Sequence, residues 1–154
     1  MRYTELGRTA IKVSKICLGT MTWGEQTSRQ EGFEQMDHAI AHGVNFFDTA
    51  EMYPIDARVE TYGHTEEIIG SWLKDRKKRS EVVIATKACG PGRHHVRNGE
   101  CNFNRQNIHT AVEDSLKRLQ TDYIDVFQLH DLPIELILSN QSFVCFRLGQ
   151  CLIY

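Results

Sequence analysis

A chain of 154 residues is long enough for one domain with its own core, and a content of 41% hydrophobic and 25% charged residues is typical of a soluble globular protein. The net charge of -2 gives no reason to expect a nucleic-acid partner. The sequence has no apolar run that could cross a bilayer, no signal-peptide pattern at its start and no Cys-x-x-Cys pair, so we expect a cytoplasmic protein without a membrane partner, a disulfide framework or a thiolate zinc site.

The first part of the chain predicts a hairpin, a strand and a helix. Residues 2–13 favour a β-hairpin with Gly7 at its turn. A buried strand is predicted over residues 15–18. Ser28 opens a capping-box pattern at the start of a helix, and Gly43 ends that helix.

Strands and helices then alternate. Apolar strands are predicted over residues 44–47, 82–86 and 123–129, with helices between them. The inward faces of these two helices are expected to carry Ile68, Ile69, Trp72 and Leu73, and then Ile108, Val112, Leu116 and Leu119 after an Asn104 N-cap. Such alternation predicts a parallel sheet covered by helices.

Titratable residues follow three of the predicted strands. Asp48 follows the second strand, with Tyr53 on the loop beyond it, while Lys87 and His130 end the third and fourth strands. Alone, each of these residues could be a helix cap, a solvated strand end or a structural histidine. A buried carboxylate needs a cationic partner, and a lysine supplies one. Their shared position at successive strand ends therefore favours a catalytic site.

Two folds place ligands at the C-terminal ends of parallel strands: the (β/α)8 barrel and the doubly wound sheet. A dinucleotide-binding doubly wound sheet usually has Gly-x-Gly-x-x-Gly after its first strand, and residues 19–24 do not match it. We therefore predict an α/β fold of the (β/α)8 TIM-barrel family, present here as an N-terminal half-barrel of about four βα units preceded by a β-hairpin.

Several segments, in order along the chain, resemble the aldo-keto reductases, and especially the Tas-like members of that family. The resemblance covers residues 1–130 and is carried by Leu18-Gly19-Thr20-Met21, Phe47-Asp48-Thr49-Ala50-Glu51-Met52-Tyr53, Glu66-Glu67-Ile68-Ile69-Gly70, Thr86-Lys87, Ser115-Leu116-Lys117-Arg118-Leu119 and Asp122-Tyr123-Ile124-Asp125. It implies an NADPH-dependent oxidoreductase that reduces small-molecule aldehydes or ketones to alcohols.

The same resemblance implies roles for the residues at the strand ends. Tyr53 would be the general acid that protonates the developing alkoxide, and Lys87 would make the phenol a better proton donor. Asp48 would pair with Lys87, and His130 would orient and polarise the substrate carbonyl. Contacts with NADP(H) would come from Thr20, Met21, Gln26 and Asp48.

The sequence departs from the family pattern after His130. We divide the chain into the N-terminal half of an aldo-keto reductase barrel, residues 1–130, and a divergent apolar tail, residues 131–154, which we interpret as a splice or frame-shift end. Leu138-Ser139-Asn140 is similar to the end of the family's fifth strand, either through a deletion or by chance. A half-barrel would have open sheet edges, so we expect self-association and weak or absent turnover by this truncated chain.

Two other functions stay open. The resemblance extends to the beta subunits of voltage-gated potassium channels, so a non-catalytic regulatory protein is one alternative, although His130 favours the enzyme. The other is an inactive truncated product. His38 and His42 are spaced to share a helix face, but the helix offers no third ligand, so we predict no metal site.

Overall fold

The computed structural model describes residues 1–130. In chain order its elements are β1 (Tyr3–Glu5), β2 (Lys12–Ser14), β3 (Cys17–Gly19), α1 (Arg29–Ala41), β4 (Phe46–Asp48), α2 (His64–Arg76), the short 3-10 helix η1 (Arg79–Glu81), β5 (Val83–Ala88), a second 3-10 helix η2 (Arg97–Gly99), α3 (Arg105–Leu119) and β6 (Val126–Leu129). The tail predicted over residues 131–154, with its Leu138-Ser139-Asn140 segment, lies outside the described residues.

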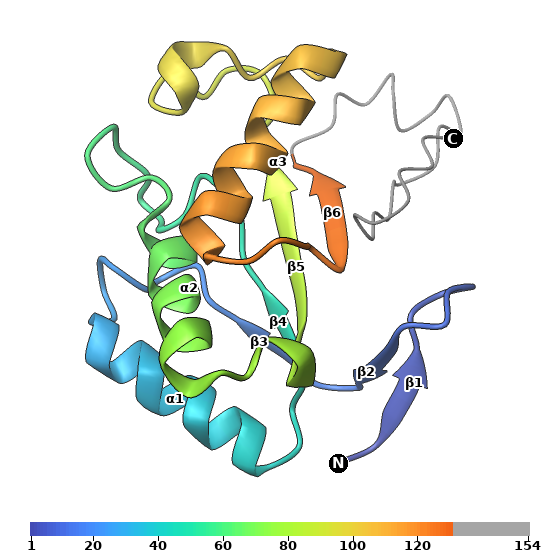
Figure 1. Cartoon of the computed structure of the whole chain (residues 1–154). Coiled ribbons are helices and arrows are strands. Elements are labelled where there is room, and N and C mark those ends of the chain that lie inside the picture. Colours follow the sequence, from blue (N-terminus) through green and yellow to red (C-terminus); the bar gives the residue numbers. More distant parts are fainter. Residues whose placement is uncertain (131–154) are drawn as a thin grey trace.

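The strands form one parallel sheet and one hairpin. Strands β3, β4, β5 and β6 pair in that order, all parallel, while β1 and β2 pair antiparallel. Helices α1, α2 and α3 all lie on one side of the parallel sheet (Figure 1). The predicted α/β fold, a hairpin followed by four strands with three helices between them, is confirmed.

The strand boundaries differ from the prediction by up to three residues, and two of these differences lie close to predicted site residues. Strand β5 runs one residue past Lys87, so the lysine lies within the strand. Strand β6 begins only at Val126. Just before it, the Asp125 carboxylate accepts hydrogen bonds from the Ile84 amide at 2.9 Å and from the Arg79 guanidinium at 2.8 Å. The Asp125 side chain therefore occupies the Ile84 amide, which the backbone of a longer β6 would otherwise have bonded.

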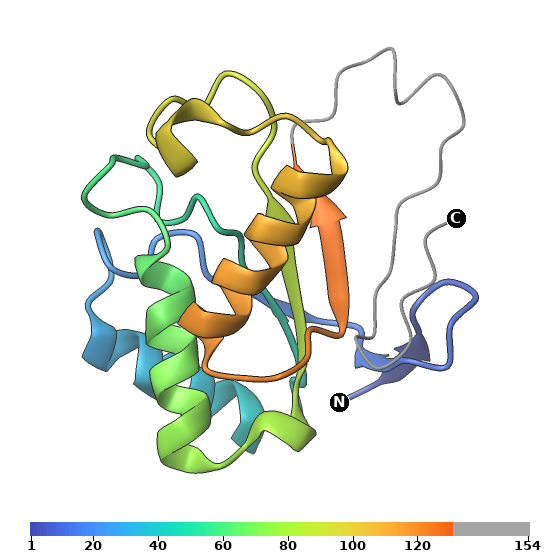
Figure 2. The ribbon, with the colours of Figure 1, turned by 45° about the horizontal axis from the view of Figure 1, so that its top comes forward.

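The hairpin lies at the end of the sheet where the parallel strands begin (Figures 1 and 2). The Asn45 side chain accepts a hydrogen bond from the Ser14 amide at 2.7 Å, and the Asn45 amide donates to the Ser14 hydroxyl at 3.1 Å. The Tyr3 hydroxyl donates to the Gly43 carbonyl at 2.8 Å. These bonds hold the hairpin against the start of β4 and leave the opposite end of the sheet to the long loops.

Helix starts follow the chemistry of their first residues. Ser28 and Glu31 form the predicted capping box of α1, and the Asn104 side chain caps α3 as predicted. Helix α2 instead starts after Gly63, whose φ of 87° suits glycine. A side chain there would also meet Arg118, because an added Cβ would lie 2.6 Å from the Arg118 Cδ.

The main core lies between the three helices and the sheet. Phe47 of β4 and Ile84 of β5 are fully buried in it, and the Phe47 ring centroid lies 5.9 Å from that of Trp72 on α2. Successive side chains of a strand point to opposite faces. Asp48 and Lys87 therefore point to the face of the sheet away from the helices.

A second, smaller cluster of buried side chains lies under the loops that follow β4 and β5. Its members are Ala50, Met52, Tyr53, Cys89, Val96 and Cys101. These loops leave the C-terminal ends of neighbouring strands, so this cluster brings residues from both loops into contact beside Asp48 and Lys87.

Candidate active site

Asp48 and Lys87 form an ion pair across neighbouring strands. The Lys87 Nζ lies 2.7 Å from the Asp48 Oδ2 and 2.7 Å from the Thr49 carbonyl oxygen. The register pairs Asp48 with Ala85, so Lys87 lies two residues further along β5 on the same face. Lys87 is only 9% exposed, and the two oxygen acceptors compensate the ammonium for its lost water.

Tyr53 lies above this pair. It is buried on the loop after β4, which is held by hydrogen bonds from the Tyr53 amide to the Ala50 carbonyl and from the Gly63 amide to the Tyr53 carbonyl. The Lys87 Nζ lies 5.0 Å from the centre of the Tyr53 ring. At this separation the ammonium is attracted by the electrons of the ring face.

His130 completes the group at the end of β6. Its amide donates to the Ala88 carbonyl at 2.8 Å, which extends the pairing of β5 with β6. The imidazole meets the Tyr53 ring edge-on, with ring centroids 6.0 Å apart and an angle of 86° between the planes. The structure therefore brings together all four residues that the sequence marked at strand ends: Asp48, Tyr53, Lys87 and His130.

The residues expected to contact a cofactor differ from one another in exposure and in their hydrogen bonds. Thr20 is buried, and its hydroxyl donates to the Asp48 backbone carbonyl at 2.8 Å. Met21 is half exposed, and its carbonyl accepts a hydrogen bond from Ile55 on the loop that carries Tyr53. Gln26 is exposed, and within residues 1–130 its side chain makes no hydrogen bond to the four residues at the strand ends.

Two buried acids, one beside the site and one on the helix side of the sheet, were not predicted from the sequence. Glu51 and Glu66 are both fully buried, and each pairs with an arginine: Glu51 with Arg97 at 3.1 Å and Glu66 with Arg118 at 2.7 Å. Burial raises the pKa of Glu51 to about 7, although the charge of Arg97 opposes this rise. The one local signal in the sequence was that Glu51, an acidic residue, lies between the apolar residues Ala50 and Met52.

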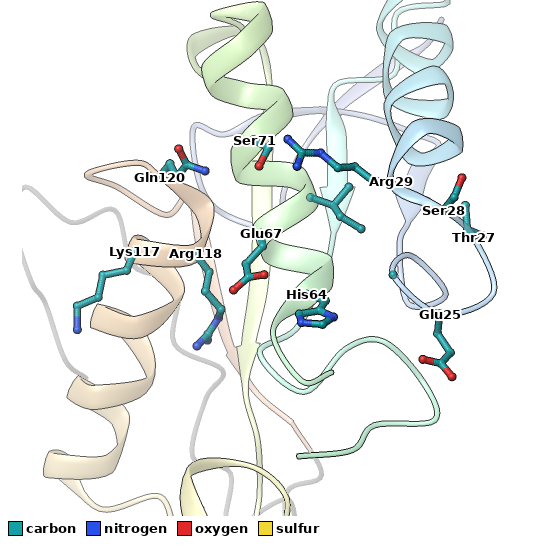
Figure 3. Close-up of a pocket in the computed structure, with 12 residues that line it drawn as sticks. Glu25, Thr27, Ser28, Arg29, His64, Glu67, Ser71, Lys117, Arg118 and Gln120 are labelled. Atoms are coloured by element: carbon teal, nitrogen blue, oxygen red, sulfur yellow. The ribbon is translucent and has the colours of Figure 1, made fainter. Parts of the chain in front are cut away.

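A separate hollow lies on the outer side of the helices, among the loop before α1, the exposed face of α2 and the C-terminal end of α3 (Figure 3). Its walls carry both signs of charge, with Arg29 and Lys117 against Glu25 and Glu67. None of the four residues at the strand ends lines it. The sheet and its core separate the hollow from those residues, so the hollow is no part of this site.

The side chains and helices of residues 1–130 also bear on metal binding and membrane insertion. No group of three or more histidine, cysteine, aspartate or glutamate side chains in this range could hold a metal ion. The His38 and His42 rings stack on each other, with centroids 4.1 Å apart. None of the helices in this part of the chain is long and apolar enough to span a membrane.

A parallel sheet with helices on one side, and a lysine, a carboxylate, a tyrosine and a histidine near the C-terminal ends of its strands, is the arrangement found in proteins of the (β/α)8-barrel class. Comparison with known proteins gives the family. The model of the Aldo/keto reductase family matches residues 15–143. The chain belongs to this family.

Three relatives show how the chain compares with longer proteins. Protein tas of Escherichia coli K12 is 44% identical over 133 residues, which cover 84% of this chain and 38% of tas. Norsolorinic acid reductase B of Dothistroma septosporum is 35% identical over 142 residues, covering 84% of this chain and 34% of that protein. The holo form of aldo-keto reductase AKR11C1 from Bacillus halodurans superposes with a TM-score of 0.72 at 32% identity, over 90% of this chain and 43% of that one. The chain thus spans well under half the length of these relatives.

Proposed function

We propose that the residues at the strand ends serve an NADPH-dependent reduction of aldehydes or ketones to alcohols, with Tyr53 as the general acid. The observation that carries the proposal is the position of Lys87. Its ammonium lies between the Asp48 carboxylate, at 2.7 Å, and the Tyr53 ring, whose centre is 5.0 Å away. The name of one relative, norsolorinic acid reductase B, supports a reduction.

Proton transfer follows from this arrangement. As the carbonyl oxygen of the substrate gains negative charge, the Tyr53 hydroxyl gives it a proton and becomes a phenolate. The Lys87 ammonium stabilises that phenolate, and a charge that is in place beforehand acts without rearrangement of the site. The Asp48 carboxylate, at 2.7 Å, compensates the ammonium for its burial and fixes where it lies.

His130 orients the carbonyl. Its ring stands edge-on to the Tyr53 ring, so the imidazole and the phenol share one side of the site. An imidazole N–H that donates to the carbonyl oxygen polarises the carbonyl bond and holds the oxygen near the Tyr53 hydroxyl.

The strand ends fit a nicotinamide cofactor. Gly19 pairs with Asp48 in the sheet register, and a Cβ added to Gly19 would meet no atom within 4 Å, so a ligand can approach the backbone there. Thr20 and Met21 follow Gly19 in the chain, and Asp48 pairs with it in the sheet register. In this proposal these three residues and Gln26 contact the cofactor. A nicotinamide cofactor bound there supplies the hydride.

The test is the rate of NADPH oxidation by the purified chain with a panel of aldehydes and ketones. We expect a slow rate, because the chain spans only 38% of the length of tas. Tyr53→Phe should lower that rate on the order of 100-fold, the usual contribution of a general acid. Tyr123→Phe is the matched control, because it also removes a tyrosine hydroxyl, but at the opposite end of the strands. Tyr123 precedes β6, and its hydroxyl donates to the Arg79 carbonyl. A wild-type rate no higher than that of Tyr53→Phe contradicts the proposal.

A further inference from the structure

The buried Glu51 carboxylate joins the two loops that flank the site. Glu51 precedes Tyr53 by two residues on the loop after β4 and is fully buried. One carboxylate oxygen accepts a hydrogen bond from the amide of Cys89. Cys89 is the first residue after β5 and follows Lys87 by two residues. The other oxygen pairs with the Arg97 guanidinium at 3.1 Å.

Arg97 is itself held from several sides. Its side chain is 9% exposed, and it also donates to the Asn107 carbonyl in the first turn of α3, at 3.2 Å. Arg97 and Asn98 have φ angles of 45° and 56°, in the left-handed region that side-chain-bearing residues seldom adopt. Such a backbone conformation persists only where neighbouring groups hold it in place. At Arg97, the ion pair with the buried Glu51 is one of the contacts that hold it.

We propose that Glu51 is a positioning residue that holds the loop after β4 against the loop after β5 and thereby sets Tyr53 against Lys87 and His130. The catalytic meaning of this position rests on the proposed function, but the connection between the loops does not. Tyr53 shares its buried cluster with Cys89 and Cys101, so a shift of the second loop displaces the packing of the tyrosine ring.

Glu66 provides a matched control. It is also fully buried and also pairs with an arginine, Arg118, at 2.7 Å. Its other oxygen accepts from the Thr86 hydroxyl at 2.6 Å. This pair joins α2, β5 and α3 on the helix side of the sheet. Arg118 lies against Gly63 at the end of the loop after β4, but the Glu66 carboxylate bonds only Thr86 and Arg118, so it does not join the two loops. Substitution of Glu66 therefore reports the general cost of breaking a buried pair.

The first readout is thiol labelling located by peptide mass. Cys89 and Cys101 are buried in the loop cluster, whereas Cys17 is exposed and serves as the internal reference. In Glu51→Leu the Cys89 amide and the Arg97 guanidinium lose their acceptor. Labelling of Cys89 and Cys101 relative to Cys17 should rise at least about tenfold. A buried donor left without an acceptor lowers the equilibrium constant for the packed state of the two loops by about that factor or more. Glu51→Gln keeps one acceptor oxygen and should restore protection in part.

The second readout follows the site itself. The edge-on contact of His130 with the Tyr53 ring shifts the imidazole proton resonances, which can be assigned by their loss in His130→Gln. Tyr53→Leu gives the unshifted position. In Glu51→Leu the His130 resonances should move to that position, and in Glu66→Leu they should stay near the wild-type position.

These measurements need neither cofactor nor turnover, so they separate this inference from the proposed function. Increased labelling and a lost His130 shift in Glu51→Leu, with Glu66→Leu unaffected in both, support the positioning role. Unchanged labelling in Glu51→Leu, or equal effects of the Glu51 and Glu66 substitutions on both readouts, overturns it.

Discussion

Lys87 is the residue on which the charge balance of the site depends. Its ammonium neutralises Asp48 at 2.7 Å, and both side chains lie on the sheet face away from the helices. The Lys87 side chain is 11% exposed and that of Asp48 31%, so the pair is only partly screened by water. Loss of the lysine leaves a carboxylate without its partner in a poorly solvated place.

We predict that Lys87→Met lowers the free energy of unfolding by about 2 kcal/mol, less than for a fully buried pair because Asp48 keeps some contact with water. Asp48→Asn combined with Lys87→Met should recover part of the loss, since the uncompensated charge is then gone. Urea denaturation of the two single variants and the double variant measures this coupling, and strictly additive effects would contradict it.

Glu51 gives a prediction with a defined pH window. Its pKa is raised from 4.5 to about 7, mainly by burial, with Arg97, the Cys89 amide, Glu66 and Arg118 around it. A raised carboxyl pKa means that the folded state holds the proton more tightly than the unfolded chain. The stability contributed by protonated Glu51 is therefore complete below about pH 4.5 and is lost as pH rises through about 7, up to roughly 3 kcal/mol.

Thermal or urea unfolding of the wild type and of Glu51→Gln at several pH values between about 5 and 8 tests this. The difference in stability between the two proteins isolates Glu51, because His95, whose pKa burial lowers, is the same in both. The wild type should lose stability relative to Glu51→Gln as pH rises. A difference that does not change with pH would show that Glu51 keeps an ordinary pKa.

Among single residues, those at strand ends are easier to predict from the sequence than those that connect two loops. Asp48, Lys87 and His130 each lie at or near the C-terminal end of an apolar strand, so their proximity could be predicted from topology alone. Glu51 and Arg97 are 46 residues apart, and neither ends a strand. Nothing local indicates that an arginine in a glycine- and histidine-containing loop pairs with an acid beside Tyr53.

At the scale of elements, α2 and α3 approach unusually closely at Gly70. A Cβ added there would lie 2.2 Å from the Arg118 carbonyl oxygen and 2.6 Å from the Leu119 carbonyl carbon. Both atoms belong to the backbone of α3, so no side-chain rotation relieves the contact.

We therefore predict that Gly70→Ala destabilises the fold by about 2 to 3 kcal/mol, the upper part of the usual range for overpacked positions, despite the better helix propensity of alanine. Gly19→Ala is the control, since its added Cβ meets nothing within 4 Å. Urea denaturation of both variants compares them. A Gly70→Ala protein as stable as Gly19→Ala would mean that the helices can separate at little cost.

Element types were predictable because caps and apolar periodicity are local. The capping box of Ser28 with Glu31 and the Asn104 cap both appear where the sequence places them. Strand ends were less predictable. The start of β6 is set by Asp125, whose carboxylate takes the Ile84 amide and excludes a longer ladder. Such competition between a side chain and the backbone depends on a partner strand that the local sequence does not identify.

At the scale of the whole molecule, the parallel sheet ends in β3 and β6, each paired on one side only within residues 1–130. We propose that β6 of one chain pairs with β3 of a second chain. Two such sheets together have the strand number of an eight-stranded barrel, and the pairing satisfies edge groups that otherwise favour aggregation.

Analytical ultracentrifugation should then show a concentration-dependent species of twice the 17.7 kDa chain mass. Ile16→Lys places a charge beside β3 at a residue 59% exposed and should favour the monomer. Val59→Lys, at a residue 64% exposed on the loop after β4, is the matched control and should leave the dimer intact. A monomer at all concentrations, or equal effects of both variants, contradicts the proposed pairing.

The most direct test of the central claim is a fluorescence titration of the purified chain with NADPH, with light scattering recorded in parallel to report the association state. We predict saturable binding by the wild type that Asp48→Asn and Lys87→Met greatly weaken, because Asp48 pairs with Gly19 in the sheet register and Lys87 forms an ion pair with Asp48. Absence of saturable binding by soluble, folded protein, or binding by both variants as tight as that of the wild type, would contradict the claim that these strand ends form a reductase site.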